Sequence, residues 1–289
     1  MKYGTNMPVF DAYADPNTVA QLARDAEAAG WDGFFIWDHI LFDPHGLNVG
    51  DPWVVLSAVA AATERITIGT LVTPLPRRRP WVLARQAVSL DQLSNGRLVL
   101  GVGIGDPVEV EFGAFGEETG AKERARMLDE GLDVITGLWT GEPYSFEGSH
   151  YHLSEMRFKP TPVQSPRIPI WVAGAWPNLA PMRRAARWDG VVPLRWEKPL
   201  GPSDLQSILG YIGQFRTSSQ PFEVVHSGST PGDGPSRGAE IVAPFEAVGA
   251  TWWVEDVGPE RFRPFTFDAS YVWPVEEVAE RVRQGPPRG

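Results

Sequence analysis

Apolar and polar positions alternate in blocks along the whole chain. Runs rich in β-branched and aromatic residues predict strands, and the stretches between them repeat apolar residues at the spacing of one helix face. The expected strands lie at 1–10, 31–38, 65–74, 97–105, 168–175, 190–194, 222–228 and 251–257. The expected helices lie at 16–29, 53–64, 79–96, 121–140, 178–188, 203–215, 239–248 and 275–284.

Short signals mark several of the helix boundaries. Asp15-Pro16 and Asp51-Pro52 each combine a capping side chain with a first-turn proline, so each pair predicts a helix start. Gly30 and Asn95-Gly96 predict the ends of two helices. Eight strands therefore alternate with eight helices, and such alternation favours parallel strands that are joined by helical crossovers.

The strand runs are almost continuously apolar, as expected of strands that are buried on both faces. Eight strand–helix units favour a closed (β/α)8 barrel, the TIM barrel, over an open sheet. We therefore expect an α/β protein with a single domain over 1–289. Residues 141–167, rich in Pro, Tyr, His and Gly, predict an insertion with a small hairpin after the fourth helix, and residues 227–238 predict a loop.

The second strand ends in an acidic residue and a histidine, Asp38 and His39. In a (β/α)8 barrel the carboxyl ends of the strands form the rim that carries the active site. One interpretation therefore places both residues in a rim site. In the other, Asp38 caps the next turn and His39 pairs with it. His226, in the seventh strand, is a minor rim candidate.

Composition narrows the classes of partner. The chain has no cysteine, which excludes disulfides, thiolate catalysis and zinc–sulfur sites and fits a reducing cytoplasm, where we expect the protein. A net charge of −10 disfavours nucleic acid and anionic membranes. The N-terminus lacks an apolar signal core, and the apolar runs are too short to span a bilayer. His150 and His152 have no accompanying acidic triad, so we expect no metal site.

Three segments resemble the luciferase-like flavin-dependent oxidoreductase and monooxygenase family, the superfamily of bacterial luciferase. They lie at 29–39, 66–105 and 168–194. The middle segment is the most specific, because it carries RP, LARQ, LDQLSNGR and LGVGIG in that order. The resemblance covers residues 1 to about 200 well and the remainder loosely. It implies a TIM-like barrel with an insertion, and a homodimer.

The Asp-His pair is most similar to the branch of this family that uses the deazaflavin coenzyme F-420. That resemblance implies that Asp38 lies beside the cofactor ring and that His39, at the ring face, is a catalytic acid/base or electrostatic group. Imidazole suits such a role because its pKa lies near neutral pH. Asp106 stands where a sugar-phosphate dehydrogenase branch has an acidic proton donor, although a cofactor-contacting asparagine of that branch is replaced here by Glu109.

The resemblance also implies a cofactor-binding surface. A non-proline cis peptide is expected at Leu71-Val72, followed by Thr73, as a bulge behind the ring. The glycine turn of the fourth strand would let the backbone approach a flat ring, and the turn after the fifth strand resembles a phosphate-binding segment. These two turns comprise Gly103, Ile104 and Gly105, and Ala173, Gly174, Ala175 and Trp176. The arginines at 77–79 have three open roles, which are contact with the acidic cofactor tail, contact with a partner subunit, or exposure to solvent. For the arginines at 183–184 the open roles are the cofactor tail or a solvated helix face.

These observations predict an oxidoreductase that moves hydride between F-420 and a small organic substrate, in a pocket that includes Arg195 and Trp196. The main alternative is a two-component monooxygenase that uses reduced FMN, oxygen and a flavin reductase partner. A non-catalytic flavin-binding barrel and a metal-dependent hydrolase are further alternatives, and the hydrolase would need more histidine and carboxylate ligands at strand ends.

Overall fold

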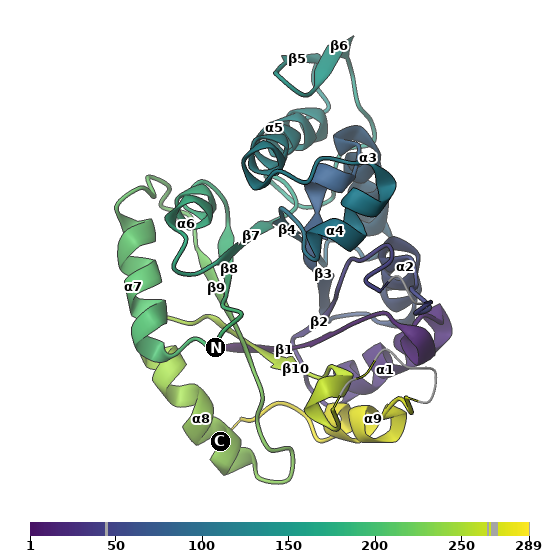
Figure 1. Ribbon diagram of the computed structural model, residues 1–289, viewed down its shortest axis with the longest axis vertical. Helices are drawn as coiled ribbons and strands as arrows, with labels where there is room; N and C mark the ends of the chain where they lie inside the picture. Colours follow the sequence, from purple (N-terminus) through teal and green to yellow (C-terminus); the bar gives the residue numbers. More distant parts are fainter. Residues whose placement is uncertain (44–45, 265, 267–270, 289) are drawn as a thin grey trace.

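A closed barrel of eight parallel strands forms the centre of the protein (Figure 1). The computed structural model describes residues 1–43, 46–264, 266 and 271–288. The barrel strands are β1 (Lys2–Met7), β2 (Gly33–Ile36), β3 (Thr67–Pro74), β4 (Leu98–Gly103), β7 (Ile170–Ala175), β8 (Gly190–Leu194), β9 (Glu223–Gly228) and β10 (Trp252–Asp256). They follow one another around the barrel in this order, and β10 pairs with β1 to close it. The predicted (β/α)8 barrel is confirmed.

Helices surround the barrel and connect its strands. They are α1 (Pro16–Ala28), α2 (Pro52–Ala62), α3 (Pro80–Leu93), α4 (Val108–Glu111), α5 (Ala121–Trp139), α6 (Leu179–Ala185), α7 (Pro202–Gly213), α8 (Pro235–Ala247) and α9 (Val275–Arg283). Asp15 and Asp51 cap α1 and α2 as predicted, because each carboxylate accepts two backbone N–H groups of the first turn. Among the described residues, no helix combines the length and the apolar character that crossing a membrane requires.

Two helices depart from the prediction in ways that the sequence signals explain only in part. The short helix α4 was not expected, and α8 begins at residue 235, inside the segment 227–238 that was predicted as a loop. A proline in the first turn suits a helix start, since its missing N–H would have no partner there. The helix signal was therefore present in the sequence, but the surrounding Gly, Pro and Ser residues outweighed it.

The insertion forms a hairpin of its own. Strands β5 (Tyr144–Glu147) and β6 (His152–Met156) pair antiparallel, apart from the barrel, after α5, the fourth of the expected helices. Figure 1 shows this hairpin beyond α3 and α5. His150 in its turn contacts Glu130 at 3.1 Å and Glu123 at 2.9 Å, both on α5. Hydrogen bonding to Glu130 and then to Glu123 raises the pKa of His150, so this histidine tethers the hairpin to α5.

Side-chain alternation divides the barrel interior into layers. Large apolar residues close its middle, and they are Phe35, Val99, Trp171, Val192, Val225, Trp252 and Val254. Glycine makes room for them: a Cβ at Gly33 would lie 2.6 Å from Phe35 and 2.7 Å from Trp252. This buried layer forms a floor beneath the carboxyl ends of the strands.

The next inward-facing positions, toward the carboxyl ends, lie above that floor. We call this layer the mouth, and it comprises Asn6, Leu71, Ala173, Ala175, Leu194, Ser227 and Asp256. All except Asn6 are half-buried or exposed, whereas the floor is buried. The barrel is therefore open at the end where active sites of this fold lie.

Candidate active site

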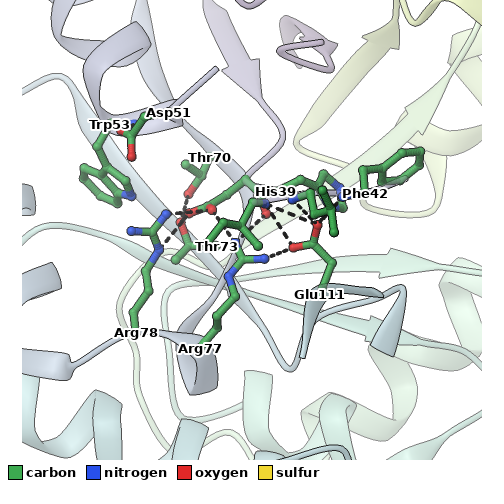
Figure 2. Close-up of polar contacts among 12 residues, drawn as sticks. His39, Phe42, Asp51, Trp53, Thr70, Thr73, Arg77, Arg78 and Glu111 are labelled. Atoms are coloured by element: carbon green, nitrogen blue, oxygen red, sulfur yellow. Dashed lines mark hydrogen bonds and ion pairs between the residues drawn. The ribbon is translucent and has the colours of Figure 1, made fainter. Parts of the chain in front are cut away.

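Asp38, which follows β2, is buried and has partners on both carboxylate oxygens. Thr73 donates to it at 2.8 Å, Arg77 at 2.8 Å, and Arg78 through two bonds of 2.8 and 3.1 Å (Figure 2). The side chain therefore does not cap the next turn, as one interpretation of the sequence had it. Asp38 instead fixes the chain that follows β3. Two of the three arginines in 77–79, Arg77 and Arg78, therefore form ion pairs with this carboxylate.

Glu111 of α4 is a second buried carboxylate, and the sequence analysis missed it. It accepts hydrogen bonds from the backbone N–H groups of Ile40, Leu41 and Phe42, the last at 2.7 Å, and it pairs with Arg77. Figure 2 shows Glu111 beneath the loop after β2. Nothing in the local sequence indicates this role, because the partners lie about seventy residues earlier in the chain.

His39 lies between Asp38 and the loop that Glu111 binds. Its ring packs edge-on against Phe42, and its Nδ1 lies 3.5 Å from Glu111 Oε1 without forming a hydrogen bond. Burial lowers the pKa of His39 to about 4, with Arg77 adding to the effect and Asp38 opposing it. The imidazole is therefore neutral at pH 7, and it is able to accept a proton.

A cavity of about 300 Å³ opens beside this histidine. Its wall brings together His39, Arg77 and Arg78 with residues from the start of α2 and the chain after β4, including Glu117. Burial raises the pKa of Glu117, while Arg77 opposes the rise. The cavity thus combines a neutral imidazole with charged groups at the ends of three adjacent strands.

The predicted cis peptide between Leu71 and Val72 is confirmed. It coincides with a shift in the pairing of β3 with β4 between Thr70 and Thr73. The Thr73 hydroxyl donates to Asp38 and lies 2.9 Å from the Thr70 hydroxyl, with which it shares a hydrogen bond. The bulge is therefore tied to the same carboxylate that holds the two arginines.

The glycine turn at the end of β4 lies against this bulge. A Cβ at Gly103 would lie 3.0 Å from Val72, so glycine leaves the backbone uncovered toward the mouth. Gly105 has φ +87°, and a Cβ there would lie 2.6 Å from Phe112. Buried Arg124 of α5 donates to the carbonyls of Ile104 and Gly105 and fixes the turn. Asp106 follows this turn and is exposed, and its role as a proton donor stays a prediction.

The end of β7 is also built from small residues. Ala173 and Ala175 face the mouth, whereas Gly174 faces α6, where a Cβ would lie 2.4 Å from Pro181. Helix α6 spans seven residues and ends at 185, three residues before its predicted end. Arg184 binds Asp129 of α5 through bonds of 2.6 and 2.9 Å, so this arginine is engaged within the protein.

The remaining candidates lie farther from these groups. Arg195 donates to both carboxylate oxygens of Asp204 at the start of α7, and Trp196 is 72% exposed. Their contact with a substrate stays a prediction. His226 is not at the rim: alternation places it on the outer face of β9, stacked at 4.0 Å on Phe245 of α8.

The structure thus places the predicted cofactor residues on one side of the barrel. Residues 38–39, 71–73 and 103–105 lie at the ends of adjacent strands β2, β3 and β4, and residues 173–176 end β7, which pairs with β4. We call this the cofactor side of the mouth. Among the described residues, no cluster of three or more histidine, aspartate or glutamate side chains is arranged to hold a metal ion.

A dehydrogenase and an uncharacterized protein each match part of this chain. An F-420-dependent glucose-6-phosphate dehydrogenase of Nakamurella multipartita is 36% identical over 190 residues, covering 64% of this chain and 54% of its own. The chain therefore spans about half the length of that relative. An uncharacterized protein of Mycobacterium tuberculosis is 31% identical over 235 residues, covering 74% of this chain and 77% of its own.

Solved structures share the fold at lower identity. An F-420-dependent secondary alcohol dehydrogenase, solved with an F-420–acetone adduct, has a TM-score of 0.75 at 16% identity, covering 98% of this chain and 97% of its own. The F-420-dependent tetrahydromethanopterin reductase of Methanopyrus kandleri has a TM-score of 0.74 at 19% identity with the same coverage. The model of the luciferase-like monooxygenase family matches residues 1–199, more than half of the chain. The chain therefore belongs to the luciferase-like monooxygenase family.

Proposed function

We propose that this protein is an oxidoreductase that transfers hydride between coenzyme F-420 and a small organic substrate at the mouth of the barrel. The observation that carries the proposal is the bulge of β3 between Thr70 and Thr73, which lies against the bare backbone of Gly103 and is tied through Thr73 to Asp38. The names of an F-420-dependent dehydrogenase relative and of two F-420-dependent structural neighbours support the choice of F-420.

The cofactor side fits a flat ring system. A Cβ at Gly103 would fill the space beside Val72 and approach Ala173 at 3.7 Å, so glycine keeps this surface level. Ala173 and Ala175 continue it toward β8 with side chains of one carbon. A surface of backbone and methyl groups at these positions lets a planar ring lie close. Leu71, Val72, Gly103 and Ala173 are the residues that would hold the ring.

Bound F-420 would supply a ring carbon that accepts or donates hydride. The protein's own groups would orient the substrate and move its proton. His39, which lines the cavity and is neutral at pH 7, is the candidate to accept a proton from a substrate hydroxyl. Asp38 cannot serve as that base while two arginines and Thr73 occupy it, so we assign it a positioning role.

The subunit arrangement stays a prediction. We propose a homodimer, for which the outer face of α2 offers an apolar surface: Val54 is 58% exposed on it, and Ile40 nearby in sequence is 51% exposed. A flavin reductase partner is required only under the alternative, in which reduced FMN and oxygen replace F-420.

Parallel titrations of F-420 and FMN, followed by quenching of intrinsic tryptophan fluorescence, test the proposal. We expect F-420 to bind more tightly than FMN. Gly103→Ala should weaken F-420 binding about tenfold, because the new methyl group enters the ring surface and one methylene-scale clash costs about 1–3 kcal/mol. Gly210→Ala on α7 is the matched control, since a Cβ there meets open space.

Tighter binding of FMN would replace the proposal with the two-component monooxygenase. Binding of neither compound would contradict a flavin-type function altogether. Equal effects of the two glycine substitutions would show that the ring does not lie on Gly103.

A further inference from the structure

Two polar residues lie side by side in the mouth, across from the cofactor side. Asn6 is the second-last residue of β1 and Asp256 is the last residue of β10, and the two are direct partners in the register of these strands. Neighbouring strands lie about 4.8 Å apart, and both side chains face inward, so the two head groups are close neighbours. Figure 1 shows β1 and β10 adjacent, with β2 and β3 on the other side of β1.

Asn6 has an amide oxygen without a partner. The residue is 9% exposed, and its Oδ1 is buried and accepts no hydrogen bond within the described part of the chain. A buried amide oxygen left in this state costs about 1–3 kcal/mol, and such groups in folded proteins almost always have a donor. The donor that is missing from the protein is therefore expected from a ligand in the mouth.

Asp256 presents a second acceptor to the same space. One of its carboxylate oxygens accepts the backbone N–H of Gly258 at 2.9 Å. Arg261 lies close, but it donates to the carbonyl of Asp256 and to Glu255, not to this carboxylate. The other carboxylate oxygen has no partner in the residues that the structure describes. Burial raises the pKa of Asp256, as expected of a carboxyl group that lacks a paired cation.

The charges around this pair disfavour an anion. Glu260 follows in the same loop, and burial and then Asp256 raise its pKa. The arginines of this end are engaged elsewhere: Arg261 with Glu255, and Arg195 with Asp204. A phosphate or carboxylate would therefore meet two acidic groups here and no cation that is free to bind it without breaking an existing pair.

We propose that Asn6 and Asp256 hold the substrate, and that they select a neutral or cationic group that donates hydrogen bonds, namely a hydroxyl or an ammonium. This inference rests on the proposed function, because it takes the opposite side of the mouth as the place of the cofactor. The proposed preference against anions would distinguish this protein from a relative that is named for a sugar phosphate. Both oxygens accept, so a donor-rich group satisfies them, whereas an anionic group satisfies neither.

Three six-membered rings of similar size form the test: cyclohexanol, protonated cyclohexylamine and cyclohexanecarboxylate. Each is titrated into the full-length protein, free and loaded with F-420, and binding is followed by tryptophan and F-420 fluorescence. We expect the ammonium and the alcohol to bind at least about tenfold more tightly than the carboxylate. The affinity for F-420 itself should not change in the variants below.

Asp256→Asn should remove most of the preference for the ammonium over the carboxylate, and Asn6→Ala should weaken both donors about tenfold by removing the buried acceptor. Glu240→Gln, on the exposed face of α8, makes the same change in net charge away from the mouth and should leave all three affinities unchanged.

Three outcomes would overturn the inference: a carboxylate that binds as tightly as the donors, an order of affinities that survives Asp256→Asn, or no binding of either donor at its solubility limit. Failure of the wild-type protein to bind F-420 is a separate result, which contradicts the proposed function. The titrations of the free protein still decide the role of Asn6 and Asp256 in that case.

Discussion

The ends of β2 and β10 are built on the same plan. Each delivers an outward-facing carboxylate, Asp38 or Glu255, that is buried against two arginines and accepts a threonine hydroxyl. At β2 the partners are Arg77, Arg78 and Thr73. At β10 they are Arg261, Arg281 and Thr230.

We call each carboxylate with its two arginines and its threonine a clamp. The two clamps differ in the residue that follows the carboxylate, which is His39 after Asp38 and Asp256 after Glu255. Beside Asp38, His39 packs among aromatic rings and faces a carboxylate that is already engaged. Beside Glu255, Asp256 faces the mouth and keeps one oxygen without a partner from the described residues. A carboxylate with all its partners supplied by the protein maintains architecture, whereas one that lacks them is available to a ligand. A carboxylate that maintains the fold and one that is available to a ligand can therefore be equally buried, and only their hydrogen-bond partners distinguish them.

Removing the charge of each clamp should produce the largest effect on stability. Glu255→Gln leaves Arg281, which is 3% exposed, without its counter-charge, so we expect a loss of roughly 3–5 kcal/mol in the free energy of unfolding. Asp38→Asn should cost less, roughly 2 kcal/mol, because Arg77 retains its pair with Glu111. Urea unfolding measures both values.

Equal losses from these two substitutions would contradict the difference in how the clamps are supported. Asp256→Asn serves as the control, since it removes a charge that has no arginine partner. We expect it to change the free energy of unfolding by less than about 1 kcal/mol.

The sequence predicted the parts of this comparison that depend on neighbours in the chain. Strand positions, the caps at Asp15 and Asp51, and the stop signals after α1 and α3 follow from local periodicity and turn chemistry. The cis peptide at Leu71-Val72 was predicted from the resemblance to a family, not from the residues themselves.

Contacts between distant segments were not predictable in this way. Glu111 and the loop after β2 meet only because β2 and β4 flank β3, and the roles of Arg77 and Arg78 depend on the same neighbourhood. His226 shows the limit within a single strand, because a shift of one position decides whether a side chain faces the barrel interior or a helix.

One buried imidazole, His39, lies in the first region, and another, His226 of β9, packs against Trp253 of β10. Acid should destabilise the protein through both. Burial lowers the pKa of His39 and of His226 from 6.5 to about 4. The unfolded chain takes up these protons first as the pH falls. Stability that is present above pH 6.5 is therefore lost between about pH 6.5 and 4, by about 3 kcal/mol per histidine, and then levels off.

His226→Phe isolates one of these contributions. A phenyl ring keeps the stacking on Phe245 and cannot titrate, so the loss between pH 6.5 and 4 should shrink by about half while stability at pH 7.5 changes little. Chemical unfolding at several pH values gives both curves. If the two curves fall in parallel, His226 is not a source of the acid sensitivity, and the carboxylates must account for it.

The smallest expected effects on the free energy of unfolding come from the two threonines that donate to the carboxylates, Thr73 and Thr230. Thr73→Val removes one hydrogen bond to Asp38 and should cost about 1 kcal/mol, and Thr230→Val should cost somewhat more because Arg281 also donates to that hydroxyl at 3.0 Å. Valine keeps the shape in both cases. Only Thr73→Val should also weaken F-420 binding, since Thr73 ties the bulge to Asp38, whereas Thr230 lies behind the strands that face the substrate. The same tryptophan quenching measures F-420 affinity in both variants. A loss of affinity in Thr230→Val would mean that the two clamps are coupled, and that the mouth does not have separate sides for the cofactor and the substrate.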